Sequence, residues 1–193
     1  MRPESGIALV RHGETDWSRS GRHTGRTDVP LTETGRAEAR AAVPLVRSLA
    51  PDRVRTSPLS RARETCALLD TGLDPVPDPD LAEWEYGDYE GITTAEIRTT
   101  VPGWTVWSAC CPGGETAEQV AARVDRVIAT CRAEPGLTLL VAHGHVLRVL
   151  AARWLGLGPD GGRHFRLDTA TLSVLGWERE NPVVLTWNLR SAA

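Results

Sequence analysis

The sequence predicts an α/β fold, a three-layer α/β/α sandwich with a mostly parallel central sheet. Short apolar runs typical of buried strands alternate along the chain with longer stretches whose apolar residues recur at helical spacing. The length of 193 residues and the 41% hydrophobic content suit one domain with a sizeable core. We therefore expect residues 1–193 to form a single domain, in which residues 83–115 are a loop or cap region.

The first half of the chain contains two predicted strands and two predicted helices. Residues 7–10 are continuously apolar, as in a strand covered on both faces. Thr32 is the expected N-cap of a helix whose apolar positions run from residue 37 to residue 49. A second strand includes Val54, and Ser57-Pro58 opens the next helix.

The second half begins with three prolines at residues 75–79, which predict an extended loop. Thr116 and Gln119 form a capping box for a helix with an apolar stripe from residue 120 to residue 131. The remaining predicted elements are a buried strand at 137–142, a helix that begins at Gly144, and strands around 172–177 and 183–187.

The charge composition excludes several kinds of chemistry. The 22 basic side chains are all arginine, and with 25 acidic ones they give a formal net charge of −3. This balance offers no electrostatic case for binding nucleic acid or an anionic membrane. The absence of lysine excludes Schiff-base catalysis by lysine and the Walker lysine. A bound anion must therefore be held by arginine, histidine or backbone amides.

The cysteines and the N-terminus predict a cytoplasmic protein. Cys66, Cys110, Cys111 and Cys131 show neither metal-ligand spacing nor a C-x-x-C pattern, so reduced thiols are expected. The first six residues, MRPESG, lack the apolar segment of a secretory signal. The apolar runs are too short to span a bilayer, and we expect a soluble protein without membrane contact.

Unusual residues follow three of the predicted strands. Arg11 and His12 come directly after the first strand, Arg61 lies about one turn into the helix after the second, and His143 and Gly144 follow the buried strand. Ligands of such folds bind beyond the carboxyl ends of the strands. Two arginines and two histidines are therefore expected at one edge of the sheet.

This set of residues suits phosphoryl chemistry. Paired arginines match phosphate oxygens, and the predicted helix starts at Ser57-Pro58 and Gly144 add backbone donors. One neutral imidazole is a competent nucleophile toward phosphorus, and the other, in its protonated form, would neutralise the transferring group. The acidic segment at residues 83–91 can supply a proton to the leaving oxygen. This chemistry requires no metal and no other cofactor.

Four motifs in order resemble the histidine phosphatase superfamily, the phosphoglycerate mutase-like proteins. They are LVRHGET at residues 9–15, RHTG at 22–25, SPLSRA at 57–62 and AHGH at 142–145. Four ordered motifs are far more specific than an isolated R-H-G. The resemblance runs from about residue 7 to residue 176, and it implies the phosphoglycerate mutase-like fold and a single histidine phosphatase domain over 1–193.

By position, the resemblance implies that His12 is the nucleophile that becomes phosphorylated. Glu83 corresponds to the general acid, which later acts as a base toward water. Glu85 and Glu90 compete for this role on sequence grounds, and position relative to the following Tyr-Gly pair favours Glu83. Arg11, Arg61 and His143 would surround the phosphoryl group, and Ser18, Thr24, Gly25 and the amide of Gly144 would be further substrate contacts.

The resemblance implies a metal-independent histidine acid phosphatase that acts on a small phosphorylated metabolite, a sugar phosphate or similar. Mutases of the family carry an inserted segment with lysine and paired arginines for a second phosphate. Residues 98–114 contain one arginine, no lysine and two tryptophans, which favours hydrolysis of one phosphate. The chain is most similar to actinobacterial acid phosphatases and fungal sugar-bisphosphate phosphatases. Mutase-type phosphoryl transfer and a catalytically silent phosphate-binding module remain alternatives.

Several residues have no single role at this stage. His145 could contact the ligand directly or lie behind the residues that do, and the sequence favours neither. His23 and His164 are expected at the surface or behind the site. Trp84, Trp104 and Trp107 are expected in the core, with a substrate-facing position for Trp84 as the alternative. The pair Cys110-Cys111 has no assigned role. A homodimer is expected by analogy alone.

Overall fold

A six-stranded sheet in the order β3-β2-β4-β1-β5-β6 forms the centre of the computed structural model, which describes residues 5–191. Residues 1–4 and 192–193, at the two ends of the predicted domain, lie outside the described residues. The strands are β1 (Gly6–Arg11), β2 (Arg53–Thr56), β3 (Val76–Pro77), β4 (Leu137–Ala142), β5 (Leu172–Glu178) and β6 (Asn181–Leu189).

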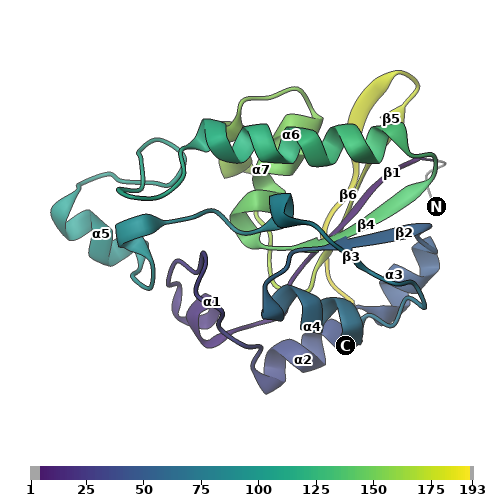
Figure 1. The fold of residues 1–193 in the computed structure, drawn as a ribbon, viewed down its shortest axis with the longest axis horizontal. Helices are drawn as coiled ribbons and strands as arrows, with labels where there is room; N and C mark the ends of the chain where they lie inside the picture. Colours follow the sequence, from purple (N-terminus) through teal and green to yellow (C-terminus); the bar gives the residue numbers. More distant parts are fainter. Residues whose placement is uncertain (1–4, 192–193) are drawn as a thin grey trace.

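The sheet is mostly parallel, as predicted. β1, β2, β3 and β4 pair in parallel, β5 runs antiparallel to β1, and β6 runs antiparallel to β5. Only β5 therefore opposes the common strand direction. Helices lie on both faces of this sheet, with α6 and α7 on one face and α2, α3 and α4 on the other (Figure 1). The helices are α1 (Asp16–Ser20), α2 (Glu33–Ala41), α3 (Val43–Leu49), α4 (Ser60–Leu68), α5 (Thr94–Thr100), α6 (Ala117–Ala133) and α7 (Gly144–Trp154).

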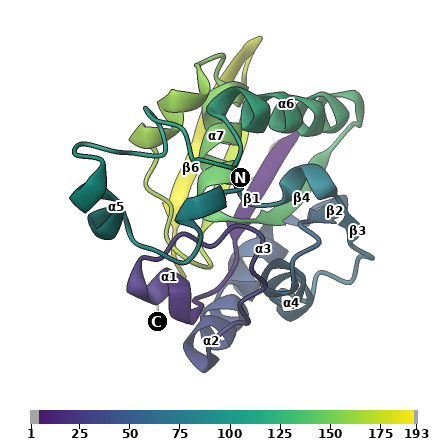
Figure 2. The same ribbon diagram turned by 60° about the vertical axis from the view of Figure 1, so that its left-hand side comes forward.

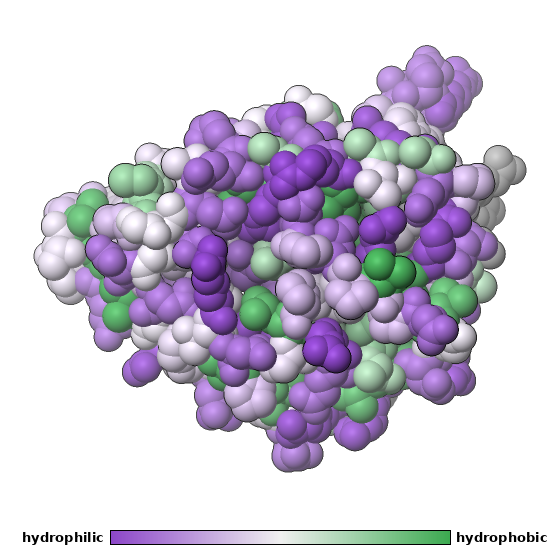
Figure 3. Space-filling view, viewed as in Figure 1, coloured by the Kyte–Doolittle hydropathy of each residue, from purple (hydrophilic) through white to green (hydrophobic). Residues whose placement is uncertain are grey.

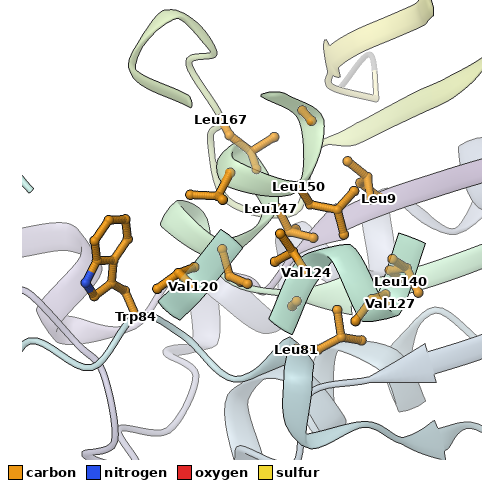
Figure 4. Packing of buried hydrophobic residues seen from close by; sticks show 14 of the residues in the cluster. Leu9, Leu81, Trp84, Val120, Val124, Val127, Leu140, Leu147, Leu150 and Leu167 are labelled. Carbon is orange, nitrogen blue, oxygen red and sulfur yellow. The ribbon is translucent and has the colours of Figure 1, made fainter. Parts of the chain in front are cut away.

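The alternation of side chains along the central strands divides the core into two layers. In β1, Ile7 and Leu9 belong to the cluster under α6 and α7, whereas Ala8 and Val10 belong to the cluster over the opposite helices. Figure 4 shows the first cluster, in which Trp84 packs beside α6 and α7. The two buried layers fix β1 and β4 as the rigid frame whose carboxyl ends carry the site.

Proline accounts for one correction to the predicted helices. The stretch after Thr32, predicted as one helix, is divided into α2 and α3 at Ala42. Pro44 lies in the first turn of α3, where its missing N–H is tolerated, whereas inside a continuous helix its ring would clash with the preceding turn. Thr32 is the N-cap, as predicted, and its side chain accepts a hydrogen bond from the Gly35 amide.

The helix after β2 also begins later than predicted. Its N-cap is Leu59, with extended backbone, and not Ser57-Pro58. The predicted extended loop at residues 75–79 contains β3, a two-residue edge strand where proline is tolerated. The short helices α1 and α5 were not predicted, since five and seven residues are too few for a clear apolar period. The capping box of Thr116 and Gln119 is confirmed.

The segment that contains α5 projects from the sheet beside α1, on the side of the molecule away from β3 (Figures 1 and 2). No helix among residues 5–191 is long and apolar enough to cross a membrane. On the face shown in Figure 3, hydrophilic side chains predominate and apolar ones are scattered.

Candidate active site

A cavity of about 360 Å³ lies beyond the carboxyl ends of β1 and β4. Its lining joins residues from the loops after these two strands with the segment around α1 and the segment around α5. Of the predicted site residues, those in the lining are Arg11, His12, Ser18, Thr24, Glu83 and Gly144. Arg61, His143 and Gly25 lie behind this lining.

His12 is held with one ring nitrogen engaged and the other available. Its backbone amide extends the β1–β4 pairing by donating to Ala142 O at 2.9 Å. Nδ1 lies 2.7 Å from Gly13 O, and because a carbonyl only accepts, Nδ1 carries the proton. Burial, reinforced by Arg11 and then Arg61, lowers the pKa of His12 well below 6.5. The ring is therefore neutral, with the lone pair on Nε2.

The turn that carries His12 is fixed by Thr65, a buried residue from α4. The Thr65 hydroxyl accepts from the Gly13 amide at 3.0 Å and donates to Arg61 O at 2.7 Å. Glycine is required at position 13 because a Cβ there would lie 2.2 Å from Gly35 O. The sequence did not indicate this role for Thr65, since its partner Gly13 is 52 residues away.

His143 lies beside His12, with ring centroids 5.1 Å apart. Arg61 Nε donates to His143 Nδ1 at 3.2 Å, so the ring proton is on Nε2, which lies 2.7 Å from Ser57 Oγ. Burial lowers the pKa of His143 well below 6.5, and Arg61 and His12 add to this effect. The predicted positive charge on His143 is therefore wrong, because burial and the guanidinium of Arg61 keep this imidazole neutral.

Arg11 presents a free donor at the base of the cavity. Its Nη1 donates to Leu167 O at 2.7 Å, while its buried Nε has no hydrogen-bond partner among the described residues. A Cβ at Gly144 would lie 3.4 Å from this Nε, so the glycine leaves room beside the guanidinium. Burial lowers the pKa of Arg11, and Glu83 partly opposes this. An unpaired buried donor of this kind is suited to an oxyanion.

Arg61, by contrast, is engaged with the protein itself. Its side chain has no exposed surface, and beyond His143 it donates to the carbonyls of Thr24, Gly25 and Thr27 at 2.9–3.1 Å. Burial lowers the pKa of Arg61, with Glu83 acting in the opposite direction. Arg61 thus ties the loop after α1 to α4 and to His143, an arrangement that depends on contacts 34 or more residues apart.

Glu83 is the sole carboxylate among the cavity-lining residues. Oε1 accepts from the amides of Trp84 and Val146 at 2.9 Å, and Oε2 accepts from the amide of His145 at 3.0 Å. Glu83 therefore lies at the N-terminus of α7, where a negative charge is favoured. Its rivals are engaged elsewhere: Glu85 pairs with Arg26 at 2.7 Å, and Glu90 binds the loop after α1.

A buried arginine on α6 holds the segment that carries Glu83. Arg123 forms a bidentate ion pair with Glu115 at 2.9 and 3.0 Å, and its Nη1 donates to the carbonyls of Asp80 and Ala82. The backbone oxygen of Glu115 accepts from the Trp84 indole at 3.0 Å. These contacts hold residues 80–84 against α6 and fix the backbone on both sides of Glu83.

The predicted substrate contacts divide into two groups. Ser18, Thr24 and Gly144 line the cavity. The Ser18 hydroxyl also accepts from the Thr15 amide at 2.9 Å as part of the α1 capping box. The Gly25 amide donates to both carboxylate oxygens of Glu90, at 2.9 and 3.0 Å, so in this structure it is not open to a ligand.

Aromatic and imidazole rings form a further part of the cavity wall. Tyr86 Oη lies 2.6 Å from His145 Nδ1. Burial raises the pKa of Tyr86 and lowers the pKa of His145, so the phenol donates to a neutral imidazole. His23, predicted at the surface or behind the site, is buried against Tyr86 and lines the cavity. Trp84 and Trp104 lie in the core, as predicted, and Trp107 packs against it. Trp104 and Trp107 also line the cavity.

The buried histidines His12, His23 and His143 and the half-buried His145 predict a loss of stability in acid. Burial lowers the pKa of each below 6.5. Below that pH the unfolded chain therefore binds more protons than the folded chain, and the free energy of unfolding decreases as the pH is lowered. Each histidine contributes up to about 1.4 kcal/mol per pH unit. The free energy of unfolding, measured with urea, should therefore fall less steeply between about pH 7.5 and about pH 5 for His145→Gln than for the parent. The exposed His164→Gln is the control, and equal slopes for all three proteins would contradict the prediction.

No group of histidine, cysteine, aspartate and glutamate within residues 5–191 is arranged to hold a metal ion. The donors that face the cavity are instead guanidinium groups, imidazoles and the amides at the start of α7. Such a set can bind an oxyanion, attack it from His12 and supply a proton from Glu83.

Comparison with known proteins agrees with this chemistry. The family model of the histidine phosphatase superfamily (branch 1) matches residues 7–190. The chain is 42% identical over 176 residues to an acid phosphatase of Mycobacterium tuberculosis, covering 89% of this chain and 86% of the relative. It is 38% identical over 182 residues to sedoheptulose 1,7-bisphosphatase of Saccharomyces cerevisiae, covering 78% and 67%. The solved structure of a Mycobacterium tuberculosis open reading frame product superposes with a TM-score of 0.93 at 38% identity, covering 97% and 99%. The chain belongs to the histidine phosphatase superfamily, branch 1.

Proposed function

We propose that the protein hydrolyses phosphomonoesters of small metabolites through a phosphohistidine intermediate on His12. The observation that carries this proposal is the state of the His12 ring. The ring is neutral, and its Nδ1–H donates a hydrogen bond to Gly13 O, which leaves the lone pair on Nε2. His12 lines the same cavity as Arg11 and Glu83. Nucleophile, anion donor and proton donor thus share one small space.

In the first step, His12 Nε2 forms a bond to phosphorus and the bond to the ester oxygen breaks. Arg11 Nε and the amide of Gly144 hold the phosphoryl oxygens, and the neutral His143 supports His12 from behind. The electron pair of the broken bond stays on the leaving oxygen, which takes a proton from Glu83. The product is the free alcohol, and the phosphoryl group remains on His12.

In the second step, water replaces the alcohol. Glu83, now ionised, accepts a proton from this water as its oxygen forms a bond to phosphorus. The nitrogen–phosphorus bond breaks, and its electron pair returns to His12 Nε2. Inorganic phosphate leaves, and both His12 and Glu83 return to their starting protonation states. His12 Nδ1 keeps its proton and donates it in a hydrogen bond to Gly13 O throughout, so a single tautomer serves both steps.

The surroundings of the cavity support a small substrate and a cap. Residues 104–107 belong to the predicted 83–115 cap region, and all four line the cavity. A volume of about 360 Å³ suits a sugar phosphate or a metabolite of similar size. Of the two relatives described above, one is named an acid phosphatase and the other a sedoheptulose 1,7-bisphosphatase. The free thiols of all four cysteines support a cytoplasmic location, and the homodimer stays a prediction.

Hydrolysis can be separated from the two alternatives in one set of assays. The pure protein is expected to release inorganic phosphate from p-nitrophenyl phosphate and from sugar phosphates, with little transfer between phosphoglycerate positions. Phosphoglycerate mutase activity above the rate of hydrolysis would favour the transferase instead. Phosphate binding without turnover of any phosphomonoester would favour the catalytically silent module.

A further inference from the structure

Four arginines line the cavity, three besides the Arg11 assigned to the phosphoryl group. Arg11 is accompanied there by Arg22, Arg98 and Arg148, which come from the loop after α1, from α5 and from α7. Residues 98–114 contain one of them, Arg98. Arg22 and Arg148 line the same space from distant parts of the chain, so no single segment of the sequence indicates the set.

These arginines differ from most others by having no carboxylate partner. Arginines elsewhere form ion pairs, such as Arg36 with Glu64 at 2.6 Å and Arg153 with Asp125 at 2.9 Å. For the four that line the cavity, the part of the chain that the structure describes places no carboxylate oxygen within 4.0 Å of a guanidinium nitrogen. Carboxylates act on three of them only from a longer range, Glu83 on Arg11 and Arg148 and Glu96 on Arg22. The excess of positive charge along a concave surface attracts anions.

Local contacts hold the three added arginines in place. Arg148 lies one turn after Gly144 on α7, its guanidinium 4.6 Å from the centre of the Trp107 ring, and its Nε donates to Gly162 O at 3.1 Å. Arg98 Nε donates to Trp104 O at 2.9 Å. The backbone of Arg22 forms a bridge with Thr93, next to α5. In each case at least one side-chain donor remains for a ligand.

The other ionisable groups of the cavity offset this charge only in part. Glu83 is the one carboxylate in the lining, and three backbone amides already bind it. Burial keeps His12, His23 and His145 neutral by lowering the pKa of each. A phosphomonoester brings a charge of about −2, which Arg11 at the base and the buried Arg61 behind it can balance.

We propose that Arg22, Arg98 and Arg148 form a second oxyanion site, so that the preferred substrate carries a further phosphate or a carboxylate besides the phosphate that is hydrolysed. This inference rests on the proposed hydrolase function and specifies its substrate class. The added group remains intact and serves for recognition, since the nucleophile and the general acid lie at the Arg11 end of the cavity.

Three substrates with similar carbon skeletons test the site. Fructose bisphosphate carries two phosphates, phosphogluconate carries a phosphate and a carboxylate, and fructose monophosphate carries one phosphate. We expect kcat/KM to be on the order of ten-fold or more higher for one of the doubly anionic compounds than for the monophosphate. The preferred one of the two identifies the second group. Equal or lower values for both would overturn the proposal.

Arg22→Gln and Arg98→Gln, both at exposed positions, then test the residues. Each is expected to lower kcat/KM for the preferred doubly anionic substrate on the order of ten-fold more than for p-nitrophenyl phosphate. Arg63→Gln, an exposed arginine on α4 outside the cavity, is the matched control and should change neither value. Equal losses on both substrates, or none on either, would overturn the assignment.

The two proposals fail in different ways. If p-nitrophenyl phosphate is not hydrolysed at all, or is hydrolysed equally well without His12, the hydrolase mechanism fails. If its hydrolysis depends on His12 but the second anionic group brings no advantage, the mechanism stands and the second site alone is rejected. Thermal unfolding of each glutamine variant separates a loss of binding from a loss of folding.

Discussion

Replacement of His12 by alanine is expected to lower kcat/KM for p-nitrophenyl phosphate at least roughly 1,000-fold. The imidazole supplies the nucleophilic nitrogen of the proposed mechanism, and without it the phosphoryl group has to be transferred directly to water. Arg11, Gly144 and Glu83 remain, so some acceleration by binding and acid catalysis persists. Steady-state kinetics of the pure variant measure the effect.

Two measurements keep this result interpretable. His164→Ala, at an exposed histidine outside the cavity, should retain full activity. Rapid quenching of the parent protein with substrate, followed by mass spectrometry of the intact chain in alkaline solution, should detect a phosphorylated form that His12→Ala lacks. Strong activity surviving in the alanine variant, or the same phosphorylated form in it, would remove His12 from its assigned role.

The frame of this site could be predicted because its signals are local. The apolar runs that became β1 and β4, and the capping box that begins α6, involve residues within a few positions of one another. The order of the motifs then placed His12 and His143 at neighbouring strand ends. Helix starts were less accurate, since Ser57-Pro58 resembles an N-terminus although the chain stays extended as far as Leu59.

The charge states and partners of the site residues could not be predicted in this way. The neutrality of His143 follows from burial and from Arg61, which is 82 residues away in the sequence. Arg61 donates hydrogen bonds to three backbone carbonyls, and these bonds depend on where the loop after α1 packs. The positions of Arg22 and Arg148 likewise depend on tertiary packing, which no window of sequence reports.

Glu83→Gln is expected to lower kcat/KM about 10²- to 10⁴-fold for a sugar phosphate, because the amide cannot protonate the leaving oxygen. The loss should be much smaller for p-nitrophenyl phosphate, whose leaving group is stable as an anion and needs little help from an acid. kcat/KM is the informative constant, since it covers the steps up to release of the alcohol. A comparison of both substrates with parent and variant measures the difference.

This contrast separates acid catalysis from a purely structural role. Glutamine keeps one carbonyl oxygen for the amides of Trp84 and Val146, but it places an NH₂ group against the amide of His145. That mismatch costs about 1–3 kcal/mol of stability, and it would disturb both substrates alike. If the two substrates lose the same factor, Glu83 acts by holding the start of α7. If the sugar phosphate alone is strongly affected, Glu83 is the proton donor, and the three amides that bind it serve to orient its carboxyl group toward the leaving oxygen.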